Sequence, residues 1–223
     1  MYTPDLIVVI FPIFAYLVGS IPTGYWLVKI LKGIDIRQLG SGSTGATNVY
    51  RNVGPAAGIL VFIIDFLKGY LPTYCFLCFP LVRTYLPNGC FGWLVQDTQS
   101  NHIFPVVIAA ATLIGHSRSI FLNFTGGKSA ATGLGTLFAL NFTVGASTFV
   151  TWMVVLFIGK MVSLASIVAT ASCIPYMYFF GGPPAYVTYC ILGFIYVTYR
   201  HKANIKRIMS GTEPKIGKAA NKP

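Results

Sequence analysis

A loop that follows the first apolar stretch carries several residue types that bind phosphate. Between Asp35 and Arg51 the chain places three glycines, four Ser or Thr hydroxyls, the amide of Asn48 and two arginines. Glycine lets the backbone approach an anion closely, hydroxyls donate to phosphate oxygens, and arginine pairs with them through two N–H groups. A plain flexible loop would account for the glycines and serines, but it would not require Arg37, Asn48 and Arg51. The loop therefore predicts a binding element for a phosphorylated ligand.

A second candidate is the run Gly126-Gly127-Lys128-Ser129, which resembles the end of a nucleotide-binding P-loop. That motif requires a glycine five residues before the Gly-Lys pair, and Leu122 stands there, so nucleotide hydrolysis is not predicted. The run does lie at the start of an expected helix. Unpaired N–H groups and the positive end of the helix dipole would then favour an anion beside Lys128.

The chain is strongly basic after its last apolar stretch, from position 200 onward. A segment of this kind commonly contacts anionic lipid. His201 and Asn204 are three residues apart, so on a continuing helix they lie on the same face. Glu213 is the one acid of this segment, and a lone carboxylate among bases is more often an ion-pair partner than a catalyst. We expect Glu213 to be structural.

Several catalytic signatures are missing from the sequence. None of the three histidines is followed by an acid five residues later, which excludes the acyltransferases that use a His-x4-Asp motif, and no Gly-x-Ser-x-Gly elbow occurs. Few acids and histidines argue against metal catalysis, and Cys75-x-x-Cys78 has no second pair to complete a zinc site. We therefore expect no metal and no cofactor, and we interpret the cysteines as small buried hydrophobes.

The composition indicates that the chain carrying these loops is embedded in a membrane. Hydrophobic residues make up 55% of the 223 residues, charged residues make up 9%, and the mean hydropathy is +0.69. A soluble chain is far less apolar. The net charge of +11 suits both cytoplasmic retention of loops and attraction of an anionic substrate. Asp65 lies inside an apolar run, where a carboxylate is energetically costly and its presence calls for an explanation.

Seven apolar segments predict an all-α bundle of about seven transmembrane spans. We expect the first to stay in the protein, because no basic leader precedes it and no small-residue cleavage site ends it. Five spans remain an alternative, since the short fourth and fifth segments could form one broken hairpin. The predicted spans are Leu6–Ile30, Val53–Leu77, His102–Gly115, Ala130–Phe142, Gly145–Gly159, Met161–Phe180 and Pro184–Tyr199.

Lys and Arg alternate between the predicted loops. The loops after the first, third and fifth spans are basic, as is the tail, whereas the segment 84–101 has Asp97 and no Lys or Arg. Basic loops stay in the cytoplasm. With seven spans the N-terminus is then outside, the C-terminus is cytoplasmic, and residues 1–223 form one integral membrane domain with a basic cytoplasmic tail at 200–223.

Taken in order, the motifs resemble those of the bacterial acyl-phosphate:glycerol-3-phosphate acyltransferases, from the first helix to the tail. Three departures stand out: Ser43 and Ser129 replace the usual Asn and Gly, and Lys202-Ala203 replaces Arg-Glu. The resemblance is carried by Gly19-Ser-Ile-Pro-Thr-Gly24, Asp35-Ile-Arg37, Gly40-Ser-Gly42, Gly45-Ala-Thr-Asn48, Arg51, Asp65-Phe-Leu-Lys68-Gly69, Gly126-Gly-Lys128, Ala131-Thr132, Ser163-Leu-Ala-Ser166, Arg200-His201 and Asn204-Ile205.

The resemblance implies transfer of a fatty acyl group from acyl phosphate to the 1-hydroxyl of glycerol 3-phosphate, giving lysophosphatidic acid and inorganic phosphate. It implies a multi-pass enzyme of the bacterial inner membrane with its active site on the cytoplasmic face. The implied partners are acyl phosphate, glycerol 3-phosphate and membrane lipid, with a functional link to the enzyme that makes acyl phosphate and no nucleic acid.

By the same resemblance, four residues have catalytic roles and six bind substrate, while Glu213 supports the tail. A carrier for organic phosphates or phosphate is the alternative, since helix N-termini and bases also build transport sites, although the chain has no evident internal repeat. The implied catalytic residues are Ser41, Arg51, Lys128 and His201, and the implied binding residues are Gly42, Thr47, Asn48, Gly126, Gly127 and Asn204.

Overall fold

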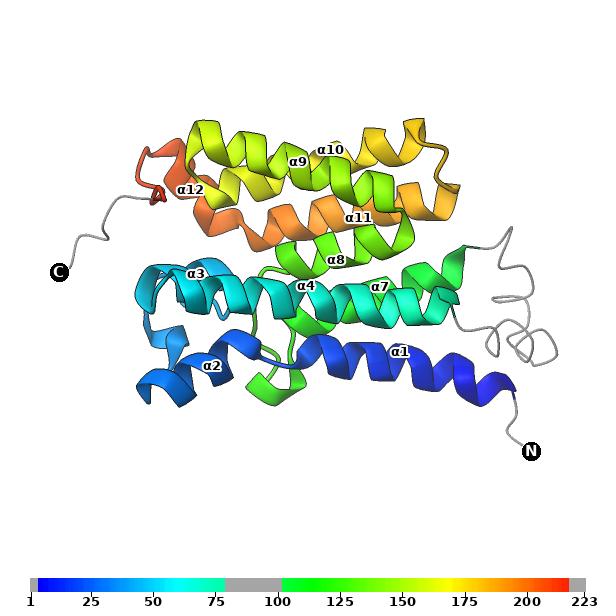
Figure 1. Ribbon diagram of the computed structural model, residues 1–223, viewed down its shortest axis with the longest axis horizontal. Coiled ribbons are helices and arrows are strands. Elements are labelled where there is room, and N and C mark those ends of the chain that lie inside the picture. The colour runs from blue at the N-terminus through cyan, green and yellow to red at the C-terminus, as the bar shows by residue number, and fades with distance from the viewer. Residues whose placement is uncertain (1–3, 79–101, 217–223) are drawn as a thin grey trace.

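The computed structural model describes residues 4–78 and 102–216, and over these ranges the fold is all-α, as the sequence predicts. The predicted segment 84–101, Cys90, Lys218 and Lys222 lie outside the described residues. Two short 3-10 helices, Ile36–Gln38 and Ile120–Leu122, lie in the loops. The α-helices are α1 (Pro4–Ser20), α2 (Thr23–Lys32), α3 (Ala46–Asn52), α4 (Pro55–Cys78), α7 (Ile103–Ser117), α8 (Ala130–Leu140), α9 (Phe142–Gly159), α10 (Val162–Phe179), α11 (Pro184–Arg200) and α12 (Lys202–Met209) (Figure 1).

The first predicted span, Leu6–Ile30, is wrong as a single helix, because α1 ends at Ser20 and α2 begins at Thr23. Pro22 lies at the break, where it lacks an N–H and restricts the residue before it. Side chains from distant segments use the carbonyls freed there. Ser20 O accepts from the hydroxyl of Ser119 at 2.5 Å, and Ile21 O accepts from the amine of Lys68 at 2.9 Å.

The remaining predicted spans agree with helices to within a few residues. Among the described residues four segments are long and apolar enough to cross a membrane: Val9–Lys32, Pro55–Cys78, Phe142–Gly159 and Val162–Phe179. These are the features of a polytopic membrane protein. The 11 residues of α8 extend about 16 Å, roughly half of a hydrocarbon core, so α8 alone is too short to cross one. The count of seven and the sidedness of the termini stay predictions.

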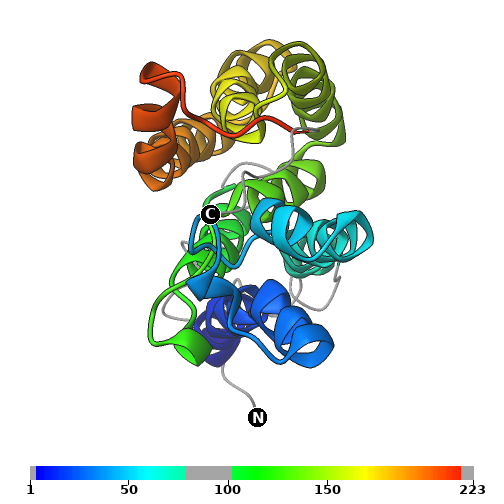
Figure 2. The same cartoon turned by 90° about the vertical axis from the view of Figure 1, so that its left-hand side faces the viewer.

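The helices form two groups with α8 between them. In the end view, α1, α2, α4 and α7 lie in one group and α9 to α12 in the other (Figure 2). One residue, Asn141, separates α8 from α9, and its side chain caps α9 by accepting from Val144 N at 3.1 Å. The segments that the sequence allowed as a broken hairpin are therefore two helices joined by a single residue.

Glycines set the register of α4 against α8. A Cβ on Gly69 would lie 2.1 Å from the carbonyl oxygen of Thr132, and one on Gly135 would lie 2.1 Å from that of Phe66. Small residues of this kind let membrane helices approach backbone to backbone. The close fit fixes where α8 begins, and with it the Gly126–Ser129 loop.

Among the described residues the buried apolar side chains form three clusters. The clusters contain Ala109, Leu137, Leu140, Val144, Cys173, Met177, Tyr186, Tyr189 and Cys190 in the first, Ala15, Phe76, Phe104 and Ile108 in the second, and Val28, Ile36, Val49 and Val61 in the third. Cys173 and Cys190 are buried as expected, whereas Cys75 and Cys78 are exposed on the apolar helix α4, which corrects the prediction for those two.

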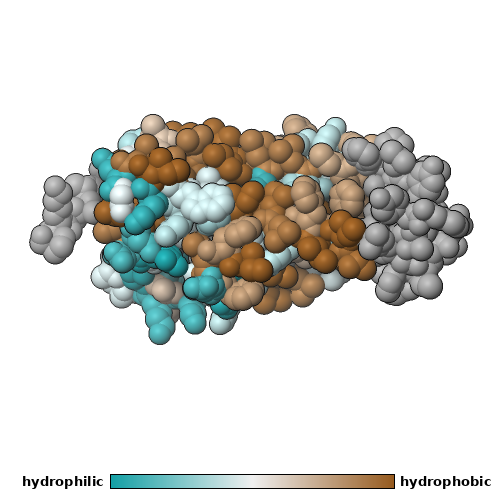
Figure 3. Space-filling view, turned by 90° about the horizontal axis from the view of Figure 1, so that it is seen from below, coloured by the Kyte–Doolittle hydropathy of each residue, from teal (hydrophilic) through white to brown (hydrophobic). Residues whose placement is uncertain are grey.

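The face that Figure 3 shows has an apolar middle and a hydrophilic end. Figure 3 shows hydrophilic side chains gathered at the end where α2, α3 and α12 lie, and mostly apolar ones along the middle of the long axis. The three loops with the chemical motifs come together at this end.

Candidate active site

A pocket of about 520 Å³ lies between the two helix groups. One part of its wall is polar and cationic, and another part is apolar. Its polar lining includes Ser41, Ser43, Thr47, Asn48, Arg51, Lys128, Ser163, Ser166, His201, Asn204 and Glu213. Its apolar lining includes Ile59, Phe62, Leu134, Leu137, Phe149, Trp152, Met153 and Leu156.

The structure brings most of the sequence-predicted residues together. Ser41, Thr47, Asn48 and Arg51 from the first loop, Lys128 from the second, and His201, Asn204 and Glu213 from the tail all line this pocket. Gly42, Gly126 and Gly127 are not among its lining residues, although Gly42 and Gly127 each neighbour a residue that is, and Gly126 lies two residues before Lys128. Three segments far apart in sequence thus form one site.

Asn48 shapes the first loop. It is buried, its side-chain oxygen accepts from Ser41 N at 3.1 Å, and its amide nitrogen donates to the carbonyls of Ile36, Leu39 and Ser43. One side chain therefore ties the turn at positions 39–43 to α3. This network holds Ser41 at the mouth of the pocket.

The Gly126–Ser129 loop is held from two sides. Gly127 N donates to His116 O at 3.1 Å on one side. On the other side the guanidinium of Arg200 donates to the carbonyls of Gly127 at 2.8 Å and of Gly126 at 3.2 Å. The loop carbonyls are thus engaged by α11, and Lys128 is carried at the start of α8.

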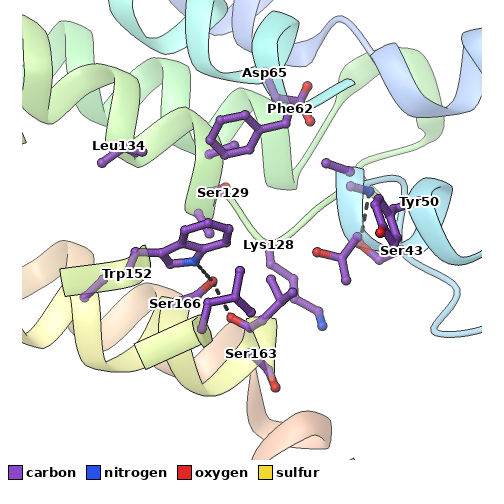
Figure 4. Close-up of a pocket in the computed structure, with 18 of the residues that line it drawn as sticks. Ser43, Tyr50, Phe62, Asp65, Lys128, Ser129, Leu134, Trp152, Ser163 and Ser166 are labelled. Atoms are coloured by element: carbon purple, nitrogen blue, oxygen red, sulfur yellow. Dashed lines mark hydrogen bonds between the residues drawn. The ribbon is translucent and has the colours of Figure 1, made fainter. Parts of the chain in front are cut away.

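Lys128 heads a chain of polar contacts across the pocket. Its ammonium donates to the side-chain oxygen of Asn204, and the Asn204 amide donates to Glu213 Oε1 at 2.7 Å. Figure 4 shows Lys128 between Ser43 and Tyr50 on one side and Ser163 and Ser166 on the other. Burial lowers the pKa of Lys128 to about 8, although the nearby Glu213 carboxylate opposes that shift. The ammonium is therefore poorly solvated and has few partners, which favours an anion beside it.

Glu213 is a buried acid with several donors. Ser163 Oγ donates to Oε1 at 2.7 Å, and Arg207 Nε lies 2.8 Å from Oε2. Burial alone would raise the pKa of Glu213, but the hydrogen bonds from Ser163, Asn204 and Arg207 hold it below the usual range. The carboxylate therefore stays ionised and links α10 to α12.

His201 is a buried, neutral imidazole. Burial lowers its pKa to about 4, and the charge of Lys128 adds to the shift. Its Nδ1 lies 2.7 Å from the carbonyl oxygen of Val197, which can only accept, so Nδ1 carries the proton. Nε2 is then left as an acceptor, suited to a hydroxyl donor.

Arg51 joins the first loop to the tail. Its Nη2 donates to the carbonyl of Pro214 at 2.9 Å, and Ile216 N donates to Lys160 O at 2.7 Å. Residues 213–216 therefore cross from α3 to the α9–α10 turn beside the pocket. Burial lowers the pKa of Arg51, but a guanidinium stays charged at neutral pH.

The apolar wall contains residues to which the sequence assigned no role. Trp152 of α9 stacks on Phe62 of α4 with ring centroids 6.2 Å apart and on Phe149 at 6.0 Å, and its indole N–H donates to Ser166 at 3.3 Å. Ser166 belongs to the Ser163-Leu-Ala-Ser166 motif, so the sequence did mark this residue. Trp152 and Phe62 lie in ordinary apolar helices, so no sequence signal marks them.

The described residues contain no group of three or more His, Cys, Asp or Glu side chains that could hold a metal ion. The fold and pocket define a class: a polytopic membrane protein with a pocket whose wall is cationic and polar in one part and apolar in another.

Comparison with known proteins places the chain within this class. The profile of the family described as glycerol-3-phosphate acyltransferase matches residues 9–211. A glycerol-3-phosphate acyltransferase of Rippkaea orientalis is 47% identical over 207 residues, covering 92% of this chain and 91% of that protein. One from Synechocystis sp. is 42% identical over 225 residues, covering 97% and 94%.

A solved structure agrees with the sequence comparisons. The crystal structure of PlsY, an integral membrane glycerol 3-phosphate acyltransferase, in its glycerol 3-phosphate form superimposes with a TM-score of 0.81 at 35% identity, covering 94% of this chain and 96% of PlsY. The chain belongs to the glycerol-3-phosphate acyltransferase family. It is therefore a multi-pass membrane acyltransferase, which favours an enzyme over the alternative of a phosphate carrier.

Proposed function

We propose that the protein transfers a fatty acyl group from acyl phosphate to the 1-hydroxyl of glycerol 3-phosphate, in phospholipid synthesis at the cytoplasmic face of a bacterial inner membrane. The observation that carries the proposal is one pocket in which Arg51 and Lys128 lie beside an apolar wall. Both substrates and the product carry phosphate, and two of the three carry a fatty chain, so each needs one or both parts of this wall.

The pocket residues have different roles in this proposal, according to their chemistry. Lys128 and Arg51 bind phosphate oxygens through charge-assisted hydrogen bonds. His201, neutral and with Nε2 free to accept, positions a glycerol hydroxyl together with Asn204. The apolar wall around Trp152 takes the fatty chain.

The transfer itself is a direct attack. The 1-hydroxyl oxygen forms a bond to the acyl carbon, the bond from that carbon to the phosphate oxygen breaks, and the proton lost by the hydroxyl ends on inorganic phosphate. Acyl phosphate is a mixed anhydride with a good leaving group, so positioning and stabilisation of developing charge matter more than a strong base. An acyl-enzyme on Ser41 is disfavoured, because the Ser41 side chain is exposed at the mouth and has no basic partner among the described residues.

The donor is the first test. Purified protein with glycerol 3-phosphate and palmitoyl phosphate is expected to form lysophosphatidic acid and phosphate, while palmitoyl-CoA and palmitoyl-acyl carrier protein give none, because the His-x4-Asp machinery is absent. Radiolabelled glycerol 3-phosphate with each donor alone measures this. Turnover with palmitoyl-CoA and none with palmitoyl phosphate would refute the donor assignment.

The sidedness of the site is the second test. Single cysteines replacing Gln38, Thr125, Lys202 and Val95 in a cysteine-free protein would be challenged with an impermeant thiol reagent on intact cells. We expect labelling at position 95 alone, since the exposed positions 38, 125 and 202 belong to the three loops that share one end. Permeabilised cells, in which 38, 125 and 202 should also label, provide the control. Labelling of those three from outside would place the site on the wrong face.

A further inference from the structure

A buried group of ionisable side chains lies next to the phosphate-binding residues and has no place in the reaction described above. Asp65 of α4 is 2% exposed, and its Oδ1 lies 2.8 Å from Lys68 Nζ and 3.7 Å from His116 Nδ1. Lys68 also donates to Ile21 O, in the break between α1 and α2. The group therefore joins α4, the end of α7 and the α1–α2 break.

An acid at this depth is costly, and Lys68 alone would compensate it. Asp and Lys three residues apart on one helix can pair with each other, so a purely structural ion pair needs no histidine. The buried imidazole of His116 is the unexplained member. Its Nδ1 faces Asp65 and has no hydrogen-bond partner among the described residues.

The other edge of the His116 ring carries the glycine loop. A Cβ on Gly127 would lie 1.9 Å from His116 Nε2, and a Cβ on Gly126 would lie 2.3 Å from His116 O. The ring and backbone of this one residue thus form the surface on which both glycines rest. Because Arg200 holds the opposite side of the loop through its carbonyls, the ring fixes how far the loop sits from α7.

We propose that Asp65 is a positioning residue that orients the His116 ring, and that the ring sets the Gly126–Gly127 backbone so that Lys128 reaches the phosphate of the substrate. The inference rests on the proposed function, in that Lys128 binds phosphate. It explains why the loop requires glycine at 126 and 127, namely contact with His116. Asp65 and His116 themselves line the pocket.

The test is kinetic and uses the full chain. Asp65→Asn is expected to raise KM for glycerol 3-phosphate or acyl phosphate about tenfold with kcat changed less than threefold, because the loop is displaced while the reacting groups remain. In a Lys128→Ala background the same substitution should raise KM less than threefold further. Thr73→Val, which removes another buried hydrogen bond of α4 outside the pocket, is the matched control and should leave both constants unchanged.

A second pair of variants tests the ring without altering Asp65. Gly127→Ala should raise KM at least tenfold in the wild-type background, but less than threefold in a His116→Ala background, where the ring that its methyl group would strike is gone. Additive effects of the two substitutions, or full effect of Asp65→Asn without Lys128, would overturn the inference.

Calorimetric binding of glycerol 3-phosphate to each variant separates this inference from the donor assignment. If the wild type fails to use acyl phosphate and Asp65→Asn still weakens glycerol 3-phosphate binding about tenfold, the proposed donor is wrong and the positioning role stands. If the wild type is active and Asp65→Asn changes neither binding nor KM, the positioning role is wrong and the proposed function stands.

Discussion

Replacing Lys128 with alanine is expected to lower kcat/KM about 100-fold, chiefly through a higher KM for a phosphorylated substrate. One charge-assisted hydrogen bond to phosphate is worth on the order of 2–3 kcal/mol, and each 1.4 kcal/mol is a factor of ten. The substitution also leaves the side-chain oxygen of Asn204 without its donor. Steady-state kinetics in each substrate, with thermal unfolding to verify the fold, measures the effect.

The matched control is Lys202→Ala. Lys202 carries the same charge, is exposed, lies next to His201 and does not line the pocket. It should change kcat/KM less than twofold. Equal losses in both variants would mean that overall positive charge, and no particular ammonium, serves the substrate.

The pH profile provides an independent check on Lys128. Burial disfavours the ammonium and brings its pKa down to about 8, so the free enzyme loses this charge as the pH rises through about 8. Below that pH the charged form is present, and kcat/KM should be constant on its basic side up to about pH 7 and fall above about pH 8. Lys128→Arg should remove this basic limb, since arginine keeps its charge. A wild-type profile that stays flat to pH 10 would contradict the assignment.

The all-α class and most helix bounds follow from the sequence because apolar length in a membrane is a strong signal. The break at Pro22 was missed for a physical reason. Pro12, Pro72 and Pro175 lie inside helices that continue through them, so proline alone does not mark a break. At Pro22 the freed carbonyls have donors, and the donors Ser119 and Lys68 come from segments 99 and 47 residues away.

The candidate site could be predicted in its parts but not in its assembly. Residue types marked the glycine loop, the Gly-Gly-Lys run and the basic tail as phosphate-binding segments. Sequence could not show that Lys128 meets Asn204, 76 residues away, because that contact depends on how α11 packs beside the Gly126–Ser129 loop. Nor could it show that Asn48 holds its own loop together through backbone carbonyls.

Three residues to which the sequence assigned no place in the site share one property. Asp65, His116 and Trp152 lie in apolar helices, and each contacts a side chain on another helix. Asp65 did give a signal, as an acid within an apolar run. His116 gave none beyond its residue type, since its role depends on the ring lying under Gly127.

Replacing Arg51 with lysine is expected to lower kcat/KM by a factor of about 30 to 100 even though the charge is kept. One edge of the guanidinium already donates to Pro214 O at 2.9 Å, and a planar fork with five N–H groups has donors left for phosphate oxygens. A lysine ammonium is a point charge that cannot hold the tail and a phosphate in fixed directions together. The loss should therefore appear in kcat as well as KM, because the tail and the substrate are both displaced.

Arg37→Lys is the control for this exchange. Arg37 lies in the same loop and makes a two-point pair with Asp35, with Nη2 2.7 Å from Oδ2, but it does not line the pocket. An exposed pair of this kind contributes little, so activity should stay within twofold. The two variants make the same chemical change and differ only in whether the side chain reaches the pocket. A smaller loss of kcat/KM in Arg51→Lys than in Arg37→Lys would therefore show that the geometry of the Arg51 guanidinium is irrelevant.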